Sequence, residues 1–511
     1  MFASLSSGLL AQASGFVLAQ VAGFTAPHLD FHALAPEIVL TGTLVVVLLV
    51  DLFTEEDSKW ALASLSGIGL LAALVPVITL AIDGGDRVLF GGAYVVDDFS
   101  LVFKALFLLS GYIVVLLSTN YVAEGDYYEG EYYFLLLSSL LGMVVMASAR
   151  DLITMFVALE LLSIPAYLLA GWRKRDLRGN EASIKYYLMG VFASGVMLYG
   201  MSLLYGLTGT TLIADIGASI GEASSSAPIV TLAIILTLIG FAFKVSAVPF
   251  HSWAPDTYEG APTPITSFLA VASKAAGFVA LMILVFVGFG GRDDVTQWFF
   301  AALSILTMTV GNLIALRQTN AVRMLAYSGI AQAGYMLAPL ATTGEPATAV
   351  TSVVVYLVIY AAMNLGAFAV VIAVSRKTRS GEISSFGGLF EYAPGLAVTM
   401  TLFLFSLAGI PPLAGWVGKF LIFRSVLEGT TTLGIVLAVA IAINSVIALY
   451  YYANVAREMW MQPVPGDDRT PIKVPISLVA AMAITVVATV VMGVIPGVVT
   501  HFGDVATLAS P

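Results

Sequence analysis

Long apolar segments follow one another along almost the whole 511-residue chain. A bilayer core about 30 Å thick is crossed by roughly 20 apolar residues in a helix, and run after run here has that length. Since 59% of the residues are apolar and only 11% are charged, the composition lies far outside the range of soluble globular proteins. We therefore predict an all-α, polytopic membrane protein.

We predict fourteen membrane-spanning helices from these runs. The first seven lie near residues 35–53, 61–82, 98–119, 131–149, 151–171, 184–208 and 228–248. The other seven lie near residues 264–290, 297–316, 322–341, 348–374, 395–424, 431–456 and 474–498. The polar connections between them are short, so we expect one membrane domain and no soluble domain.

Residues 1–34 precede the first predicted span and are only weakly apolar. They carry no Lys or Arg and therefore lack the positive n-region of a secretory signal peptide. We interpret them as an N-terminal extension, with an additional span as the alternative.

The positive residues predict an orientation, because Lys and Arg in short loops are retained on the cytoplasmic side. With both termini outside, the inner loops hold fourteen of the 22 Lys and Arg, and the outer loops hold three. The other five lie within or near spans: Lys104, Lys244, Lys274, Lys419 and Arg424. We expect a multi-pass protein of the cell inner membrane with both termini extracytoplasmic.

The composition also argues against metal or redox chemistry in this chain. There is no cysteine, which excludes disulfides, thiolate metal sites and iron-sulfur clusters held by this chain. His28, His32 and His501 lie outside the predicted spans, His251 follows the span that ends near residue 248, and no glycine-rich dinucleotide motif follows a strand. The net charge of -10 comes from acidic residues in loops, so no nucleic-acid partner is expected.

One outer loop is expected to contain a short β-hairpin. Apolar and β-branched residues alternate between Arg87 and Asp98 on either side of Gly91 and Gly92. Its role would be structural.

Four charged residues lie inside apolar spans: Glu160, Lys244, Lys274 and Lys419. A charge near the bilayer centre costs at least about 2.5–3.5 kcal/mol on insertion scales, so each is a functional candidate by default. The alternatives are a hydrogen-bonded carboxyl in helix packing for Glu160 and a Lys274 that reaches the membrane surface. We predict that all four take part in proton transfer.

Two of these lysines lie beside predicted helix breaks. Pro249 follows Lys244, and Pro411 and Pro412 precede Lys419. Broken helices in corresponding places are typical of transporters with inverted repeats. We predict two inverted five-helix repeats, and divide the chain into residues 1–34, 35–130, 131–290 (first repeat), 291–458 (second repeat) and 459–511 (a loop and the last span).

Lysine suits proton transfer because burial disfavours its charged form, whereas a nearby carboxylate favours it. Glu160 and Lys244 would form such a pair if their helices adjoin. His251 is either a proton relay or a capping and packing residue. We interpret Lys104, which is able to extend toward the outer surface, and Arg424 as structural.

Four segments carry a family resemblance: FKVSAVPFHSWAPDTYEGAPTPITSFLAVASKAAGF, NEASIKYYLMG, GNLIALRQTNAVRMLAYSGIAQAGYM and SLAGIPPLAGWVGKF. They resemble the antiporter-like subunits of complex I and of Mrp-type cation/proton antiporters, over about residues 35–500. Lys419 resembles the residue of the N and L branches, since subunit M and the Mrp-type D protein carry Glu there. The chain ends soon after its last predicted span, whereas subunit L continues into a lateral helix, so we expect the N branch.

The resemblance implies a proton-translocating membrane-arm subunit of an NADH-quinone oxidoreductase. FMN, iron-sulfur clusters, NADH and quinone would be bound by other subunits, and the partners would be other membrane-arm subunits and lipid. The chain would belong to a translocase without doing redox chemistry itself. By position, Glu160 and Lys244 are similar to the family's first buried pair, Lys274 to its central lysine and Lys419 to its exit-side lysine.

Two alternatives stay open. One is an Mrp-type cation/proton antiporter driven by ion gradients, which Lys419 disfavours. The other is a structural spacer between neighbouring subunits, with its charges neutralised internally.

Overall fold

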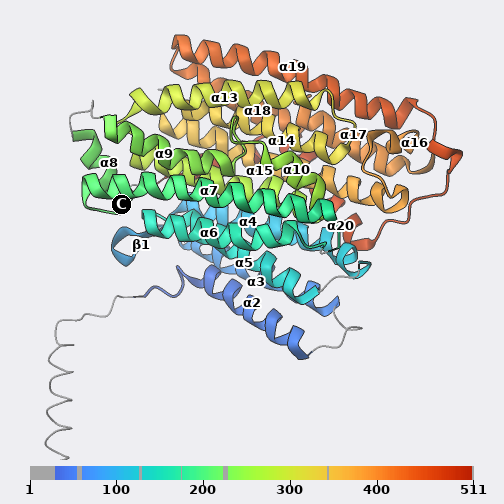
Figure 1. Ribbon diagram of the computed structural model, residues 1–511, viewed down its shortest axis with the longest axis horizontal. Coiled ribbons are helices and arrows are strands. Elements are labelled where there is room, and N and C mark those ends of the chain that lie inside the picture. The colour runs from blue at the N-terminus through green and yellow to red at the C-terminus, as the bar shows by residue number, and fades with distance from the viewer. Residues whose placement is uncertain are drawn as a thin grey trace, which may run out of the picture.

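The computed structural model describes residues 29–53, 60–125, 129–173, 175–222, 228–341 and 345–508. Most of the predicted N-terminal extension, residues 1–28, lies outside the described residues. The described chain is almost entirely helical, and its helices run side by side along the horizontal direction of Figure 1. Eleven described helices are long and apolar enough to cross a membrane, and two more are apolar but shorter. The prediction of an all-α polytopic membrane protein is confirmed.

The first two described helices lie at one edge of the bundle, drawn in blue in Figure 1, and the third lies further inside and is mostly buried. They are α2 (Ala35–Phe53), α3 (Trp60–Asp83) and α4 (Asp98–Ala123). Asp97 caps the start of α4: its side chain accepts from the Ser100 N–H, while the Ser100 hydroxyl accepts from the Asp97 N–H. This reciprocal cap satisfies two of the backbone donors that a helix leaves unpaired at its start.

The predicted hairpin lies between α3 and α4. It consists of β1 (Arg87–Leu89), the 3-10 turn η2 (Phe90–Gly92) and β2 (Tyr94–Val96). The strands are antiparallel, with Arg87 opposite Val96. Gly91 and Gly92 both have positive φ, which glycine adopts without the strain of a Cβ atom. The hairpin prediction is confirmed.

The middle of the chain contains the first broken helix. Its elements are α5 (Glu129–Ser148), α6 (Leu152–Ala170), α7 (Leu177–Thr208), α8 (Ile213–Glu222), α9 (Pro228–Lys244), α10 (Trp253–Gly260), α11 (Thr263–Phe268), η3 (Leu269–Ser273), α12 (Lys274–Ile283) and η4 (Leu284–Gly288). Helix α9 ends at Lys244, before Pro249, so the predicted span of 228–248 is shorter than expected. From α11 to η4 the chain is continuously helical, and η3 and η4 are π-helical.

The last part contains the second broken helix. Its elements are α13 (Asp293–Ala315), α14 (Ala321–Leu337), η5 (Ala338–Ala341), α15 (Pro346–Thr378), η6 (Ile383–Phe386), α16 (Leu389–Tyr392), α17 (Pro394–Ala408), α18 (Ala414–Glu428), α19 (Thr432–Met461), η7 (Pro465–Asp467), α20 (Ile476–Val494) and α21 (Gly497–Val505). The break predicted at Pro411 and Pro412 lies within the predicted span 395–424, where residues 409–413 separate α17 from α18. Two prolines in that segment cannot donate backbone hydrogen bonds.

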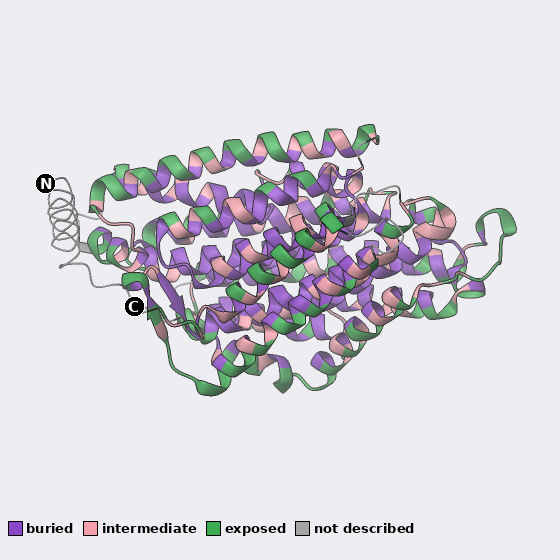
Figure 2. Ribbon diagram, turned by 90° about the horizontal axis from the view of Figure 1, so that it is seen from below, coloured by how far each residue is buried: buried purple, intermediate pink, exposed green. Residues whose placement is uncertain are grey.

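Burial distinguishes the centre of the bundle from its outside. Helix α15 and the helix from α11 to η4 are buried along almost their whole length. Helices α7 and α19 expose large apolar side chains such as Ile184, Phe192 and Val446. Figure 2 shows the same pattern, with buried residues inside and exposed ones along the outer helices. Exposed faces that carry many large apolar side chains are typical of surfaces that contact lipid or another subunit.

Candidate functional site

Lys244 is buried at the point where α9 stops. Its Nζ donates to Ser163 Oγ at 2.9 Å on α6 and to Tyr186 Oη at 3.3 Å on α7. Both acceptors are neutral hydroxyls. The break after Lys244 therefore places an ammonium group between three helices, held by oxygens that do not neutralise its charge.

Glu160 lies one turn before Ser163 on α6, so the two side chains share a face of that helix. No ion pair within 4 Å joins Glu160 to Lys244 among the described residues. Glu160 Oε1 is buried without a hydrogen-bond partner. The predicted pair is therefore brought into one neighbourhood, but Lys244 contacts Ser163 rather than the carboxylate.

Lys274 is buried on the central helix, immediately after the π-helical segment η3. Its Nζ donates to the carbonyl oxygen of Gly329 on α14 at 2.6 Å. A Cβ atom on Gly277, one turn further, would stand 3.3 Å from Lys244 Cγ, so the helices that carry the two lysines pack directly. π-Helical turns are frequent at functional sites because they shift the side chains that follow.

Lys419 lies on α18, just after the second break. Its Nζ donates to the carbonyl oxygen of Ala408, the last residue of α17, at 2.8 Å. That carbonyl lies at a helix end, where backbone oxygens lack intrahelical partners. Lys419 Nζ also stands 5.0 Å from the centre of the Tyr335 ring. As at Lys244, a broken helix supplies the place for a buried lysine.

Helix α14 connects the central lysine to Lys419. Gly329, Gln332 and Tyr335 follow one another at single-turn spacing, and they contact respectively Lys274, the end of α17 and Lys419. Gln332 Nε2 donates to Leu407 O at 3.1 Å, next to the carbonyl that holds Lys419. Helices α12, α14, α17 and α18 thus form a continuous row of buried polar contacts from Lys274 to Lys419.

Several residues of this row were not predicted from the sequence. Gln332 also donates to Tyr452 Oη at 3.2 Å and accepts from Tyr356 Oη, and Tyr452 Oη lies 2.5 Å from Ser328 Oγ. The available signal was the helical spacing of Ser328, Gln332 and Tyr335 within a predicted span. Ser163 and Tyr186 offered no comparable signal, because hydroxyls are common in membrane helices.

His251 and the three prolines lie in the breaks. His251 is half-buried between α9 and α10, and its Nδ1 is buried without a hydrogen-bond partner. No hydrogen bond joins its ring to Lys244 within the described ranges. The Val248–Pro249 and Pro411–Pro412 peptide bonds are cis.

Lys104, interpreted as structural, does not extend to the surface. Its ammonium is fully buried, 2.8 Å from Glu37 Oε1, and it donates to Tyr94 Oη at 3.3 Å. Nothing in the sequence indicated that Glu37, at the start of α2, is the partner of Lys104. A second buried ion pair joins Arg150 to Asp97 at 2.6 Å nearby.

Apolar spans, two helices broken between apolar segments and a buried lysine beside each break are features of antiporter-type membrane proteins. The family described as NADH:quinone oxidoreductase/Mrp antiporter, TM, matches residues 149–446. NADH-quinone oxidoreductase subunit N of Trichlorobacter lovleyi is 42% identical over 443 residues, which cover 85% of this chain and 88% of that protein. The chain belongs to the NADH-quinone oxidoreductase subunit N family.

Solved structures agree in fold. A chain of respiratory complex I from Thermus thermophilus, with bound aureothin, has a TM-score of 0.75 and 32% identity, and the match covers 91% of this chain and 98% of that one. A chain of the Mrp complex from Dietzia sp. has a TM-score of 0.82, with coverages of 94% and 97%, but only 20% identity. The second match supports the fold alone.

Proposed function

We propose that this chain is a proton-translocating membrane-arm subunit of an NADH-quinone oxidoreductase, and that Lys244, Lys274 and Lys419 carry the protons. The observation that carries the proposal is the row of three buried ammonium groups, each held by neutral oxygens, with no carboxylate within 4 Å of any of them among the described residues. A purely structural lysine at such depth would gain stability from a counter-ion.

The row suits stepwise transfer for electrostatic reasons. Hydroxyl and carbonyl oxygens accept a hydrogen bond from the charged lysine but do not fix its proton as a carboxylate would. In a low-dielectric interior, a charge gained at one lysine disfavours the charged form of its neighbour. Glu160 would set the state of Lys244, and α14 would relay the effect from Lys274 to Lys419. His251 is proposed as a relay at the first break.

The proposal includes the surroundings of the subunit. NADH oxidation and quinone reduction would take place in other subunits, with FMN and iron-sulfur clusters bound there, and other antiporter-like membrane-arm subunits would be neighbours. The protein would lie in the cell inner membrane with both termini extracytoplasmic. Residues 131–290 and 291–458 would form the two inverted repeats, each with one broken helix.

The test is proton pumping per NADH oxidised in membranes that carry Lys244→Ala, with assembly of the complex checked by native gel. We expect an assembled complex with strongly reduced pumping or reduced coupled oxidation. Unchanged pumping would show that Lys244 is structural. Sodium-dependent proton flux in vesicles without NADH would instead support an antiporter, and we expect none.

A further inference from the structure

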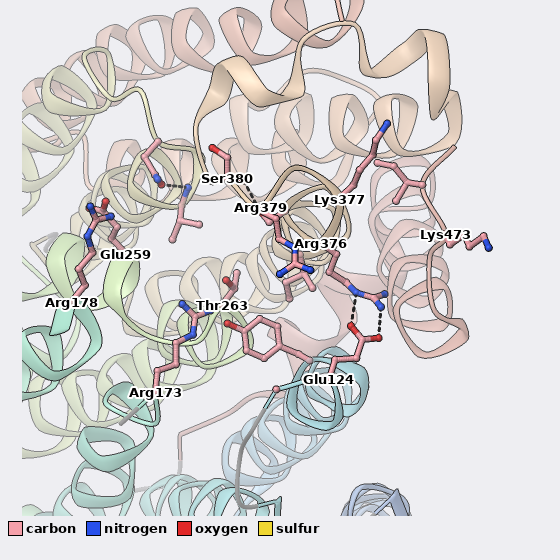
Figure 3. A pocket seen from close by; sticks show the side chains of 18 of the residues that line it. Glu124, Arg173, Arg178, Glu259, Thr263, Arg376, Lys377, Arg379, Ser380 and Lys473 are labelled. Carbon is pink, nitrogen blue, oxygen red and sulfur yellow. Dashed lines mark hydrogen bonds and ion pairs between the residues drawn. The ribbon is translucent and has the colours of Figure 1, made fainter. Parts of the chain in front are cut away.

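A cavity of about 860 Å³ lies at the end of the bundle where α4 and α15 finish (Figure 3). Its walls come from the end of α4, the connection between α6 and α7 with the start of α7, the end of α10, the starts of α11 and α14, the end of α15 and the segment before α20. It is separate from the lysine row, and no part of the proposed proton transfer uses it.

Positive charge dominates this cavity. Its basic lining residues are Arg173, Arg178, Arg376, Lys377, Arg379 and Lys473. Figure 3 shows Arg173 and Arg379 pointing toward its middle, while Lys377 and Lys473 point away at one side. The two acidic lining residues are already paired, Glu124 with Arg376 and Glu259 with Arg323 at 2.8 Å. The side chains of Arg178, Arg379 and Lys473 have no ion pair within the described residues.

Two buried hydrogen-bond donors at this cavity lack acceptors, which also favours an anionic ligand. Tyr121 Oη and Arg376 Nη1 are buried and have no hydrogen-bond partner in the protein. The Arg173 guanidinium stands 5.5 Å from the centre of the Tyr121 ring and 3.7 Å from Asp176. Burial lowers the pKa of Arg173, and Asp176 opposes this shift only in part. An anionic oxygen group would satisfy these donors and offset the buried charge.

An apolar groove of about 480 Å³ continues from the cavity. Pro471 and Ile472 line both spaces. From there the groove runs between α17 and α20, along Val479, Met482 and Val486, which share one face of α20. Since α20 is long and apolar enough to cross a membrane and α17 is a shorter apolar helix, the groove leads from the basic cavity toward the apolar part of the bilayer.

We propose that the cavity and groove together bind one anionic phospholipid, with its phosphate among the basic side chains and an acyl chain in the groove. A basic pocket between membrane helices is a favourable site for an anionic head group. The adjoining groove favours a lipid over a soluble phosphate, because only a lipid fills both spaces. This site does not depend on the proposed proton transfer.

The test uses the full chain, purified in detergent and examined by native mass spectrometry with added phosphatidylglycerol or phosphatidylcholine of equal chain length. We expect retained phosphatidylglycerol in clear excess. Arg173→Gln and Arg379→Gln should each weaken its retention about fivefold. Arg379→Lys, which keeps the charge, should retain it. Equal retention of the two lipids by the wild type would overturn the proposal.

Arg457→Gln is the matched control, because Arg457 is exposed near the end of α19 and lines neither space. Only variants whose thermal unfolding midpoints match the wild type are compared. If Arg457→Gln weakens retention as much as Arg379→Gln, the effect is general surface charge and the proposed site is wrong.

Two further measurements distinguish a bound lipid from a bound soluble anion. Val479→Trp should fill the groove and reduce retention of dioleoyl phosphatidylglycerol to the level of its dihexanoyl analogue. Inorganic phosphate should not displace the long-chain lipid at millimolar concentration. Displacement by phosphate, together with no effect of Val479→Trp, would show a soluble-anion site and overturn the lipid assignment.

Discussion

Two kinds of buried lysine lie in this bundle. In the N-terminal helices, Lys104 is fully buried and stands 2.8 Å from the carboxylate of Glu37. In the row, Lys244, Lys274 and Lys419 are also buried, but their ammonium groups donate hydrogen bonds to hydroxyl and carbonyl oxygens. The first kind has a counter-ion at hydrogen-bond distance, and the second has none among the described residues.

The difference separates a structural charge from one suited to transfer. A lysine paired with a carboxylate holds its proton firmly, because losing it would leave the acid buried and uncompensated. A lysine on neutral oxygens is costly to keep charged in a membrane and is therefore easier to deprotonate. The break beside Lys419 provides a neutral oxygen, because the Ala408 carbonyl lies at a helix end, whereas the oxygens at Lys244 are side-chain hydroxyls of α6 and α7.

The largest effect is expected from Lys274→Arg. Arginine keeps the positive charge near Gly329 O but does not release its proton in proteins. Because a positioned proton-transfer group typically contributes at least about a hundredfold, proton pumping per NADH should fall by about tenfold or more in an assembled complex. Pumping and assembly would be measured in the same membranes. If the arginine variant pumps normally, Lys274 provides charge only, and the contrast with Lys104 has no functional meaning.

The opposite result is expected for Lys104→Ala. This change leaves Glu37 buried without its partner, which costs about 3–5 kcal/mol for a buried ion pair. The complex should lose activity faster on heating, while the assembled fraction pumps as many protons per NADH as the wild type. The double variant Glu37→Gln with Lys104→Met should recover most of the thermal stability. Loss of pumping in that stable double variant would place Lys104 among the transfer residues.

The sequence predicted most of the spans and the burial of Lys244, Lys274 and Lys419, because both follow from transfer free energies of single segments. It separated Lys104 from Lys274 only by their depth in the spans and identified no contact of either residue, since each is a lysine within an apolar run. The difference depends on Glu37, far away in the chain, and on the carbonyl of Gly329. Pro411 and Pro412 predicted the break at residues 409–413, but the apolar run did not give the bounds of the two helices on either side of it. Contacts between distant helices decide these properties.

A smaller effect is expected from Gln332→Leu. The change removes the donor to Leu407 O and the acceptor for Tyr356, both beside the connection to Lys419. Because each lost buried hydrogen bond costs about 1–3 kcal/mol, we expect pumping to fall by roughly five- to tenfold while the complex assembles. Ser304→Ala is the control. Ser304 lies on α13 and donates to the carbonyl oxygen of Gly334 on α14 at 2.7 Å, and it does not contact a lysine. Equal effects of the two variants would remove α14 from the proposed path.

The smallest effect is expected from Ser163→Ala, which tests whether the neutral oxygens at Lys244 matter. It removes the hydroxyl acceptor that lies 2.9 Å from Lys244 Nζ, but Tyr186 Oη remains at 3.3 Å from the same nitrogen. One hydrogen bond to a buried charge contributes about 1.5–3 kcal/mol, and relaxation toward Tyr186 should recover part of it, so the pumping rate should change about two- to threefold. Ser139→Ala is the matched control, because Ser139 donates to Leu162 O at 2.6 Å beside Ser163 and does not contact Lys244.

Substituting Ser163 by Asp should reduce pumping further, since a carboxylate there would give Lys244 the kind of partner that Lys104 has. If Ser163→Asp pumps as well as the wild type, a counter-ion does not prevent transfer, and the distinction between the two kinds of lysine fails at this site.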